Sequence, residues 1–191
     1  MTETTATFTA GFDRYVCHGD TTTAEHDGWT FAAEVHRDDS FGAPWLEHDG
    51  HGEVTDWTTR DKAPGELVLC SDRGSKRYYD FAGACALALR DGWNCPPYEI
   101  EGETPRQKAA RAARHNFEVL RAWCNDEWFW CGIVVTVSRD GIELGSASLW
   151  GIEANYPGSK NEYLLEVANE IAEEALEEAE TRLASLCDCA S

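Results

Sequence analysis

The sequence predicts an α+β fold, a mainly antiparallel sheet of hairpins with about three helices packed on one of its faces. Two segments rich in β-branched and aromatic residues are each interrupted by Asp-Gly, a turn signal because glycine accepts positive φ. Two other segments repeat apolar residues at helical spacing beside helix start or stop signals. A last amphipathic segment, dense in glutamate, predicts a long acidic C-terminal helix.

The sheet is predicted around a central hairpin at residues 128–150, with its turn at Arg139-Asp140-Gly141. Its first arm holds a nearly continuous apolar run from Ile133 to Val137, which favours a central strand covered on both faces. An earlier hairpin is predicted at residues 21–36. Its second arm alternates apolar and more polar residues after His26-Asp27-Gly28, the period of a half-buried strand. A short buried strand is predicted at residues 67–70.

Three helices are predicted from their ends and apolar stripes. The first covers residues 76–91 and stops at Gly92, a residue typical of helix C-termini. The second runs from residue 104 to about 123, because Thr104 and Gln107 form a capping box around Pro105 at the first helical position. The third begins near Asn161. Residues 37–65, rich in Asp, Gly, His and Pro, are expected to form a long surface loop with one short helical turn.

The chain is predicted to be one domain over residues 1–191, with residues 1–10 loose. Its 191 residues and 42% hydrophobic content are sufficient for a packed core. The start of the sequence lacks the basic and apolar segments of a signal peptide, and no apolar run reaches the ~18 residues of a membrane span. We therefore expect a cytoplasmic protein whose eight cysteines stay reduced.

A net charge of -19, from 35 acidic and 16 basic residues, is the most unusual property of the sequence. Such a chain repels nucleic acids and anionic membranes, and is attracted to basic protein surfaces. Residues 1–60 have a net charge of -9, and residues 160–191 contain nine acidic and two basic residues. The alternative is that the acidity only provides solubility or reflects a salt-rich habitat.

The C-terminal helix holds the candidate partner-binding residues. On ~40 Å of helix, its glutamates are sparser than the phosphates of duplex DNA, which follow one another at ~3.4 Å along each strand. They have the right sign for a groove that binds a phosphate backbone, but an ordinary solvated helix face explains them as well. The candidate residues share one side of the predicted helix: Glu162, Glu166, Glu170, Glu173, Glu174, Glu177 and Glu178.

Other candidate sites are weaker. His48 and His51 are the only pair that resembles metal ligands, and a polar loop explains them better because no partner spacing follows. The segment 125–130 runs from acidic residues into Trp128, Phe129 and Trp130, which predicts either a binding corner or a buried roof of the sheet. The sequence contains neither a nucleophile elbow nor a phosphate-binding glycine loop. We expect no catalytic residue, no cofactor and no enzyme activity.

The helix at residues 104–123 is the one basic segment, with five basic residues and one acidic residue between positions 106 and 121. It is expected to neutralise part of the protein's own acidic surface, and the C-terminal helix is one candidate for that contact. A binding site for a phosphate or an acidic partner is the alternative. Cys187-Asp188-Cys189 could chelate metal adventitiously, but its place at a helix end argues against a prepared site.

Three blocks carry a resemblance to known proteins: residues 79–93, which end in Arg90-Asp91-Gly92-Trp93, residues 121–128, and residues 145–153. They resemble small uncharacterised proteins of phages, prophages and plasmids, over roughly residues 76–180. This resemblance implies an origin in a mobile element and carries no functional residue with it. A compact acidic protein of this origin also resembles the anti-CRISPR and anti-restriction inhibitors as a functional class.

These observations lead to a functional hypothesis with two alternatives. The hypothesis is a non-enzymatic inhibitor in the host cytoplasm that blocks a basic nucleic-acid-binding groove of a CRISPR effector or restriction complex, by DNA mimicry. It binds neither nucleic acid nor membrane directly, and its oligomeric state stays open. The first alternative is a phage accessory or regulatory protein-binding module whose acidity serves solubility. The second is a metal-dependent enzyme.

Overall fold

The computed structural model describes residues 8–189, with the side chains of Asp188 and Cys189 left out. Most of the predicted loose start therefore lies outside the described residues. The contacts within the chain divide it into two compact units, where the sequence analysis expects one domain. Unit 1 comprises Met1–Phe41 and Trp128–Ser191, and unit 2 comprises Gly42–Glu127.

Unit 1 contains a four-stranded antiparallel sheet in the order β1-β2-β5-β6. Its strands are β1 (Thr21–His26), β2 (Trp29–Arg37), β5 (Phe129–Arg139) and β6 (Ile142–Ala154). Both predicted hairpins are confirmed. In each turn the Asp and the Gly both have positive φ, at Asp27-Gly28 and Asp140-Gly141, as a two-residue type I′ turn requires. The apolar strand β5 occupies an inner position, between β2 and β6.

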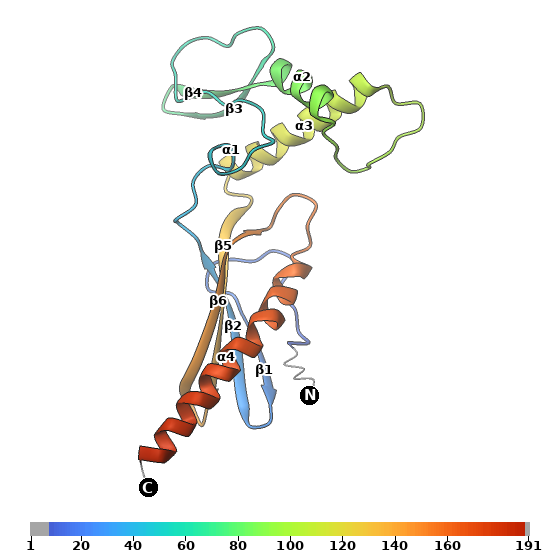
Figure 1. Ribbon diagram of the computed structural model, residues 1–191. Helices are drawn as coiled ribbons and strands as arrows, with labels where there is room; N and C mark the ends of the chain where they lie inside the picture. Colours follow the sequence, from blue (N-terminus) through green and yellow to red (C-terminus); the bar gives the residue numbers. More distant parts are fainter. Residues whose placement is uncertain (1–7, 190–191) are drawn as a thin grey trace. The chain divides into compact units, whose positions relative to one another are not determined.

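Helix α4 (Glu162–Cys189) covers one face of this sheet and packs against β5 and β6 (Figure 1). Its apolar stripe is buried and consists mainly of small residues, so the helix backbone comes close to the strands. The buried stripe comprises Leu164, Ala168, Ile171, Ala172, Ala175 and Ala179. On the sheet, Ile133, Val135 and Val137 of β5 are fully buried beneath it.

The opposite face of the sheet is only partly covered. Val134 and Thr136 of β5 are half-buried there, and the indole of Trp150 on β6 lies against Gly132. One face of β5 is covered, as predicted. The prediction that its other face is covered as well is wrong. The run Ile133 to Val137 looks continuous, but its alternate residues meet different environments because strand side chains alternate between faces.

Unit 2 pairs a small hairpin with two helices. Strands β3 (Glu66–Asp72) and β4 (Ser75–Asp80) form a two-stranded antiparallel sheet. Helices α2 (Phe81–Asp91) and α3 (Pro105–Cys124) pack against each other and against β3. The short helix α1 (Pro44–Glu47) is the helical turn expected within residues 37–65. The core of the unit centres on Leu69, Tyr79, Ala113, Phe117 and Leu120.

Two features of the predicted helices change in the structure. The three long helices do not share one face of one sheet, because α4 packs on the four-stranded sheet while α2 and α3 pack within unit 2. An apolar stripe shows that a helix face is buried but not what buries it. The first predicted helix also begins later. Residues 76–80, predicted as the start of this helix, belong to β4. Asp80 then caps α2 by accepting a hydrogen bond from the amide of Gly83 at 2.9 Å.

Other helix signals are confirmed. Gly92 ends α2 in the left-handed conformation. At the start of α3 the Thr104 hydroxyl accepts a hydrogen bond from the Gln107 amide, and the Gln107 side chain accepts one from the Thr104 amide. This reciprocal pairing satisfies two of the amides that the first helical turn leaves without partners.

Candidate protein-binding surface

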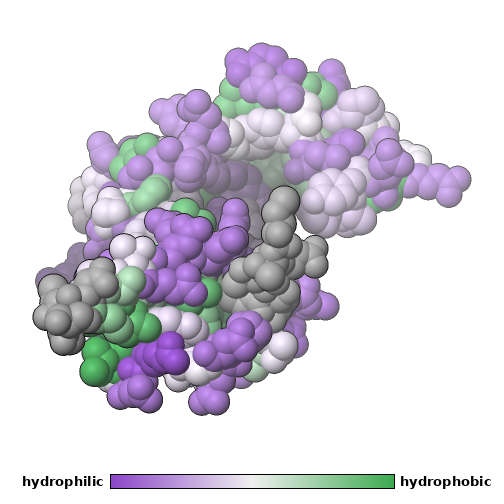
Figure 2. All heavy atoms as spheres, turned by 60° about the horizontal axis from the view of Figure 1, so that its bottom comes forward, coloured by the Kyte–Doolittle hydropathy of each residue, from purple (hydrophilic) through white to green (hydrophobic). Residues whose placement is uncertain are grey.

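The negative charge of the protein is concentrated in unit 1. This unit carries 20 acidic and five basic residues, a net charge of -15, whereas unit 2 carries 15 acidic and 11 basic residues, a net charge of -4. The face of the molecule seen in Figure 2 is mainly hydrophilic, with smaller hydrophobic patches. Long-range attraction follows the summed charge, so unit 1 has the stronger electrostatic attraction for a basic surface.

All seven predicted partner-binding glutamates lie on α4 and are exposed, as is Glu180. They lie on the side of the helix that faces away from β5 and β6, since the buried stripe around Ala168 and Ala175 occupies the other side. Between Glu162 and Glu180 the helix axis advances ~27 Å at ~1.5 Å per residue. Eight carboxylates over this length give one charge per ~4 Å, close to the ~3.4 Å that separates phosphates along one strand of duplex DNA.

These glutamates differ in their contacts within the protein. Glu178 accepts a hydrogen bond from the backbone amide of Ser146 on β6 at 2.8 Å and lies 3.6 Å from Arg182. Glu162 lies 3.8 Å from Lys160. Among the residues that the structure describes, the others have no hydrogen-bond or ion-pair partner; they are Glu166, Glu170, Glu173, Glu174 and Glu177. The carboxylate of Glu178 therefore joins helix to sheet, and the others point to solvent.

Three of the five basic residues of α3 have partners within unit 2. Arg111 makes a two-pronged ion pair with Glu103 at 2.8 Å, and Arg121 pairs with Glu118 at 2.6 Å. The guanidinium of Arg114 lies over the ring of Phe81 at 4.7 Å from its centroid. Two arginines of this helix thus neutralise acidic residues of the protein itself, as expected, and these acidic residues lie within unit 2.

One of the two weak metal candidates, His51, belongs to a hydrogen-bonded network in unit 2. The Oδ1 atom of Asn116 accepts hydrogen bonds from the amide of Gly52 at 3.1 Å and from the hydroxyl of Tyr79 at 2.9 Å. Its Nδ2 atom therefore donates to Nδ1 of His51, at 2.7 Å. Burial lowers the pKa of His51, and the neighbouring His48 lowers it further. The neutral form with its proton on Nε2 fits this network.

No cluster suited to a metal ion is present among residues 8–189. In that part of the chain no three His, Cys, Asp or Glu side chains lie together as potential ligands. His51 already uses Nδ1 for Asn116. The predicted chelating segment Cys187-Asp188-Cys189 lies partly outside the described atoms, because the side chains of Asp188 and Cys189 are left out. The seven cysteines whose side chains are described form no disulfide.

The proposed binding corner at residues 125–130 does not present its aromatic residues to solvent. Trp128, Phe129 and Trp130 are each at most 7% exposed. The Trp128 ring packs edge-on against Trp130 and Tyr156. The burial of these rings supports the alternative prediction, that they cover the sheet inside the protein. An anchor for a partner has to be exposed before binding, and these residues are not.

One exposed feature was not predicted from the sequence: the loop at residues 95–103 between α2 and α3. Tyr98 and Ile100 on this loop are two of the exposed large apolar residues of unit 2. The alternation of apolar and acidic residues in Tyr98-Glu99-Ile100-Glu101 is visible in the sequence. What holds this loop in place is a contact with α3 that sequence spacing does not reveal.

Comparison with protein-family models, curated proteins and solved structures finds no match. No helix among the described residues is both long enough and apolar enough to cross a membrane.

Proposed function

We propose that this protein is a non-enzymatic inhibitor, of the anti-CRISPR or anti-restriction kind, that binds a host nucleic-acid-binding complex. Its acidic helix α4 would occupy the basic groove that normally holds DNA or RNA, in the cytoplasm of the host cell. The observation that carries this proposal is the row of exposed glutamates from Glu162 to Glu180, at a spacing similar to that of the phosphates of one DNA strand.

The way α4 is held supports a binding role for this row. The helix packs on β5 and β6 through a stripe of small apolar residues, so its carboxylates are presented on a rigid support. A preformed surface loses little conformational entropy on binding. Like charges spaced three and four residues apart slightly destabilise a helix, and this helix retains them where lysines would relieve the repulsion.

The charge distribution defines the partner's chemistry. A unit of net charge -15 attracts a surface rich in Lys and Arg over distances of about a Debye length, ~8–10 Å at physiological salt. Such attraction raises the association rate and weakens as salt increases. Grooves that bind nucleic acid have this composition because they neutralise phosphates. The inhibitor and the nucleic acid would then compete for the same groove.

The test is a binding assay between the full chain and purified CRISPR effector and restriction complexes at low and high salt, about 50 and 500 mM. The key variant replaces Glu166, Glu170, Glu173 and Glu177 with Lys. These positions form the centre of the exposed side of α4 and have no partner among the described residues. We expect this variant to keep its fold and to lose binding and inhibition of nucleic-acid cleavage.

A matched control separates the position of the charge from its total. Replacing Asp49, Asp56, Asp61 and Asp72 with Lys changes the net charge by the same amount on exposed residues of unit 2. We expect this control to retain inhibition. Equal losses in both variants would show that only overall acidity matters, and retained inhibition by the folded α4 variant would exclude α4 as the contact.

A further inference from the structure

The loop between α2 and α3 is closed by one arginine. Arg111 of α3 donates through Nε and Nη2 to both carboxylate oxygens of Glu103, at 2.8 and 2.9 Å. Its Nη1 atom donates to the carbonyl oxygen of Cys95 at 2.8 Å and lies 3.0 Å from the Cys95 sulfur. Arg111 therefore ties the first and last residues of the segment 95–103 to the same helix.

This clamp is shielded from solvent. The side chains of Arg111 and Glu103 are only 21% and 10% exposed, and Cys95 is buried. The hydrogen bonds from Arg111 lower the pKa of Glu103, and those to Glu103 raise the pKa of Arg111. Both groups therefore stay charged at neutral pH. A two-pronged Arg–carboxylate pair also fixes orientation, which a single lysine contact does not do.

Several local features fix the backbone between the clamped ends. Pro96 and Pro97 restrict φ at the start of the loop. At its end the amide of Glu103 donates to the carbonyl of Ile100 at 3.1 Å, which closes a turn. The capping box of α3 begins at the next residue. The loop is thus ordered before any partner binds.

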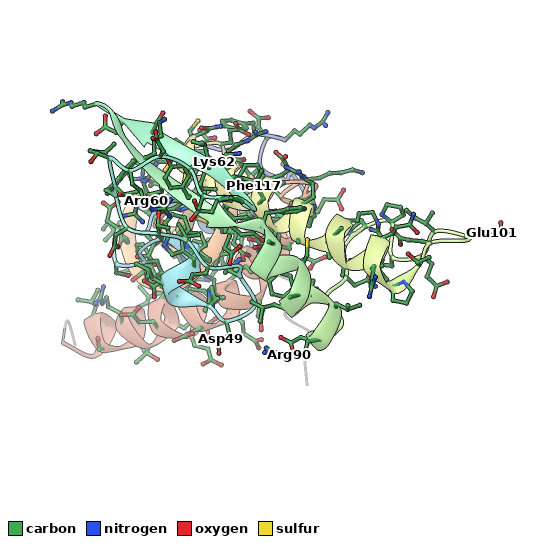
Figure 3. The ribbon with its side chains drawn as sticks, turned by 90° about the horizontal axis from the view of Figure 1, so that it is seen from above. Asp49, Arg60, Lys62, Arg90, Glu101 and Phe117 are labelled. Carbon is green, nitrogen blue, oxygen red and sulfur yellow. The ribbon has the colours of Figure 1, made fainter. Side chains whose placement is uncertain are left out.

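This ordered loop exposes two large apolar side chains. Tyr98 is 63% exposed and Ile100 is 44% exposed. They alternate with Glu99 and Glu101, which are also exposed. Glu101 lies at the outer end of the loop in Figure 3. A hollow of about 450 Å³ lies between these side chains and Lys108 of α3.

We propose that residues 96–102 form a protein-recognition loop that inserts Tyr98 and Ile100 into an apolar pocket rimmed by Lys and Arg. Tyrosine is enriched among residues that dominate binding energy. A closed loop avoids most of the ordering cost that a flexible one would meet on binding. Glu99 and Glu101 match a basic rim, and they disfavour a nucleic acid or an anionic membrane as the partner.

This inference concerns unit 2 and goes beyond the proposed role of α4 in unit 1. The acidic helix attracts a partner through charge, which salt weakens. The loop binds through burial of apolar surface, which salt does not weaken. The two surfaces are therefore separable by experiment, whether they meet one partner or two.

The first measurement is photocrosslinking of the full chain in a lysate of CRISPR-bearing bacteria, with a photoreactive phenylalanine in place of Tyr98. The control carries the same label in place of Tyr15, which is 58% exposed in unit 1. We expect a partner that crosslinks at position 98 and not at 15, through a peptide with apolar residues flanked by Lys or Arg. Equal crosslinking at both positions, or none at position 98, overturns the proposal. A crosslink to an acidic surface of the partner also overturns it.

The second measurement is the affinity for that partner at low and high salt. We expect the double variant Tyr98→Ala and Ile100→Ala to bind about tenfold or more weakly at both salt concentrations. The matched control is Tyr15→Ala with Ile142→Ala, since Ile142 is 62% exposed in the turn of unit 1. It should bind like the original chain. Unchanged affinity of the loop variant overturns the proposal.

The clamp has its own variant. Arg111→Lys keeps the charge and both apolar side chains but cannot hold Glu103 and Cys95 together. We expect about threefold to tenfold weaker binding from loss of preorganisation, with the fold checked by circular dichroism. The α4 charge-reversal variant is measured in parallel. If only the loop variant loses binding, α4 is not the contact for this partner and this inference stands. If only the α4 variant loses binding, this inference fails and the proposed role of α4 stands.

Discussion

Gly145 of β6 lies directly beneath the backbone of α4 at Ala175. A β-carbon on Gly145 would overlap the carbonyl oxygen of Ala175 and would lie 2.5 Å from the amide nitrogen of Ala179. Both contacts are with backbone atoms, which cannot rotate away as a side chain would. The missing side chain at position 145 therefore sets how closely the acidic helix approaches the sheet.

Gly145→Ala is expected to destabilise unit 1 by about 1–3 kcal/mol, the usual cost of overpacking a close contact. Urea unfolding gives the free energy, and amide hydrogen exchange of β6 and α4 locates the change. Ser146→Ala is the control, because the Ser146 side chain is exposed and its backbone amide remains. It should change stability by less than about 0.5 kcal/mol. If Gly145→Ala is equally neutral, α4 has room to shift.

Glu178 is expected to contribute more to stability than the other glutamates of α4. Glu178→Ala removes the carboxylate that accepts from the Ser146 amide, at a cost of about 0.5–1 kcal/mol. This cost is smaller than that of a buried hydrogen bond to a charged group, because the Glu178 side chain is 46% exposed. Glu177→Ala, one residue earlier and without a partner among the described residues, should be close to neutral in the same urea assay. Equal effects would show that the Ser146 contact adds no stability.

The hydroxyl of Tyr79 is expected to stabilise unit 2. Tyr79 is fully buried, and its hydroxyl donates to Asn116 at 2.9 Å and lies 3.2 Å from the carbonyl of Ala113. Tyr79→Phe should lower the unfolding free energy by about 1–2 kcal/mol. Tyr98→Phe, at an exposed position, should change it by less than about 0.5 kcal/mol. Thermal and urea unfolding measure both, and a neutral Tyr79→Phe would contradict the network.

Stability is expected to fall as pH drops through the titration of His51. Burial lowers the pKa of this imidazole in the folded protein below its ordinary value of 6.5. Above that value both folded and unfolded states are neutral at His51, so its contribution to stability is fully present. Below it the unfolded chain binds a proton first, and stability decreases by up to about 1.4 kcal/mol per pH unit.

Urea unfolding between about pH 7.5 and pH 5.5 tests this dependence. His51→Gln is the comparison, because a glutamine oxygen can accept from Asn116 at every pH in that range. The variant should show a shallower loss of stability toward acid. Identical pH profiles for the two proteins would show that His51 titrates as an exposed histidine.

Much of the fold was predictable because its signals are local. The two Asp-Gly turns require positive φ, and the structure has it at Asp27 and Asp140. The capping box at Thr104 and the stop at Gly92 depend on residues a few positions apart. The exposure of the glutamates on α4 followed from helical periodicity, which separates them from the stripe around Ala168.

The predictions that failed depend on packing outside the predicted element itself. Residues 76–80 pair with β3 as a strand although they continue an apolar helical pattern, because pairing at Tyr78 and Tyr79 buries both rings. The aromatic residues after Trp128 are buried by neighbours such as Tyr156. Both outcomes depend on which side chains the packed core buries, because tertiary packing overrides local propensity.

By itself the sequence determined the α+β class, the hairpin turns, the helix ends and the acidic face of α4, because each depends on spacing of a few residues. Only the tertiary structure decided which helix covers which sheet, that Gly145 lets α4 lie against β6, and that Arg111 closes the loop carrying Tyr98. These depend on contacts between distant segments. Burial, close approach and hydrogen bonding are properties of the folded chain.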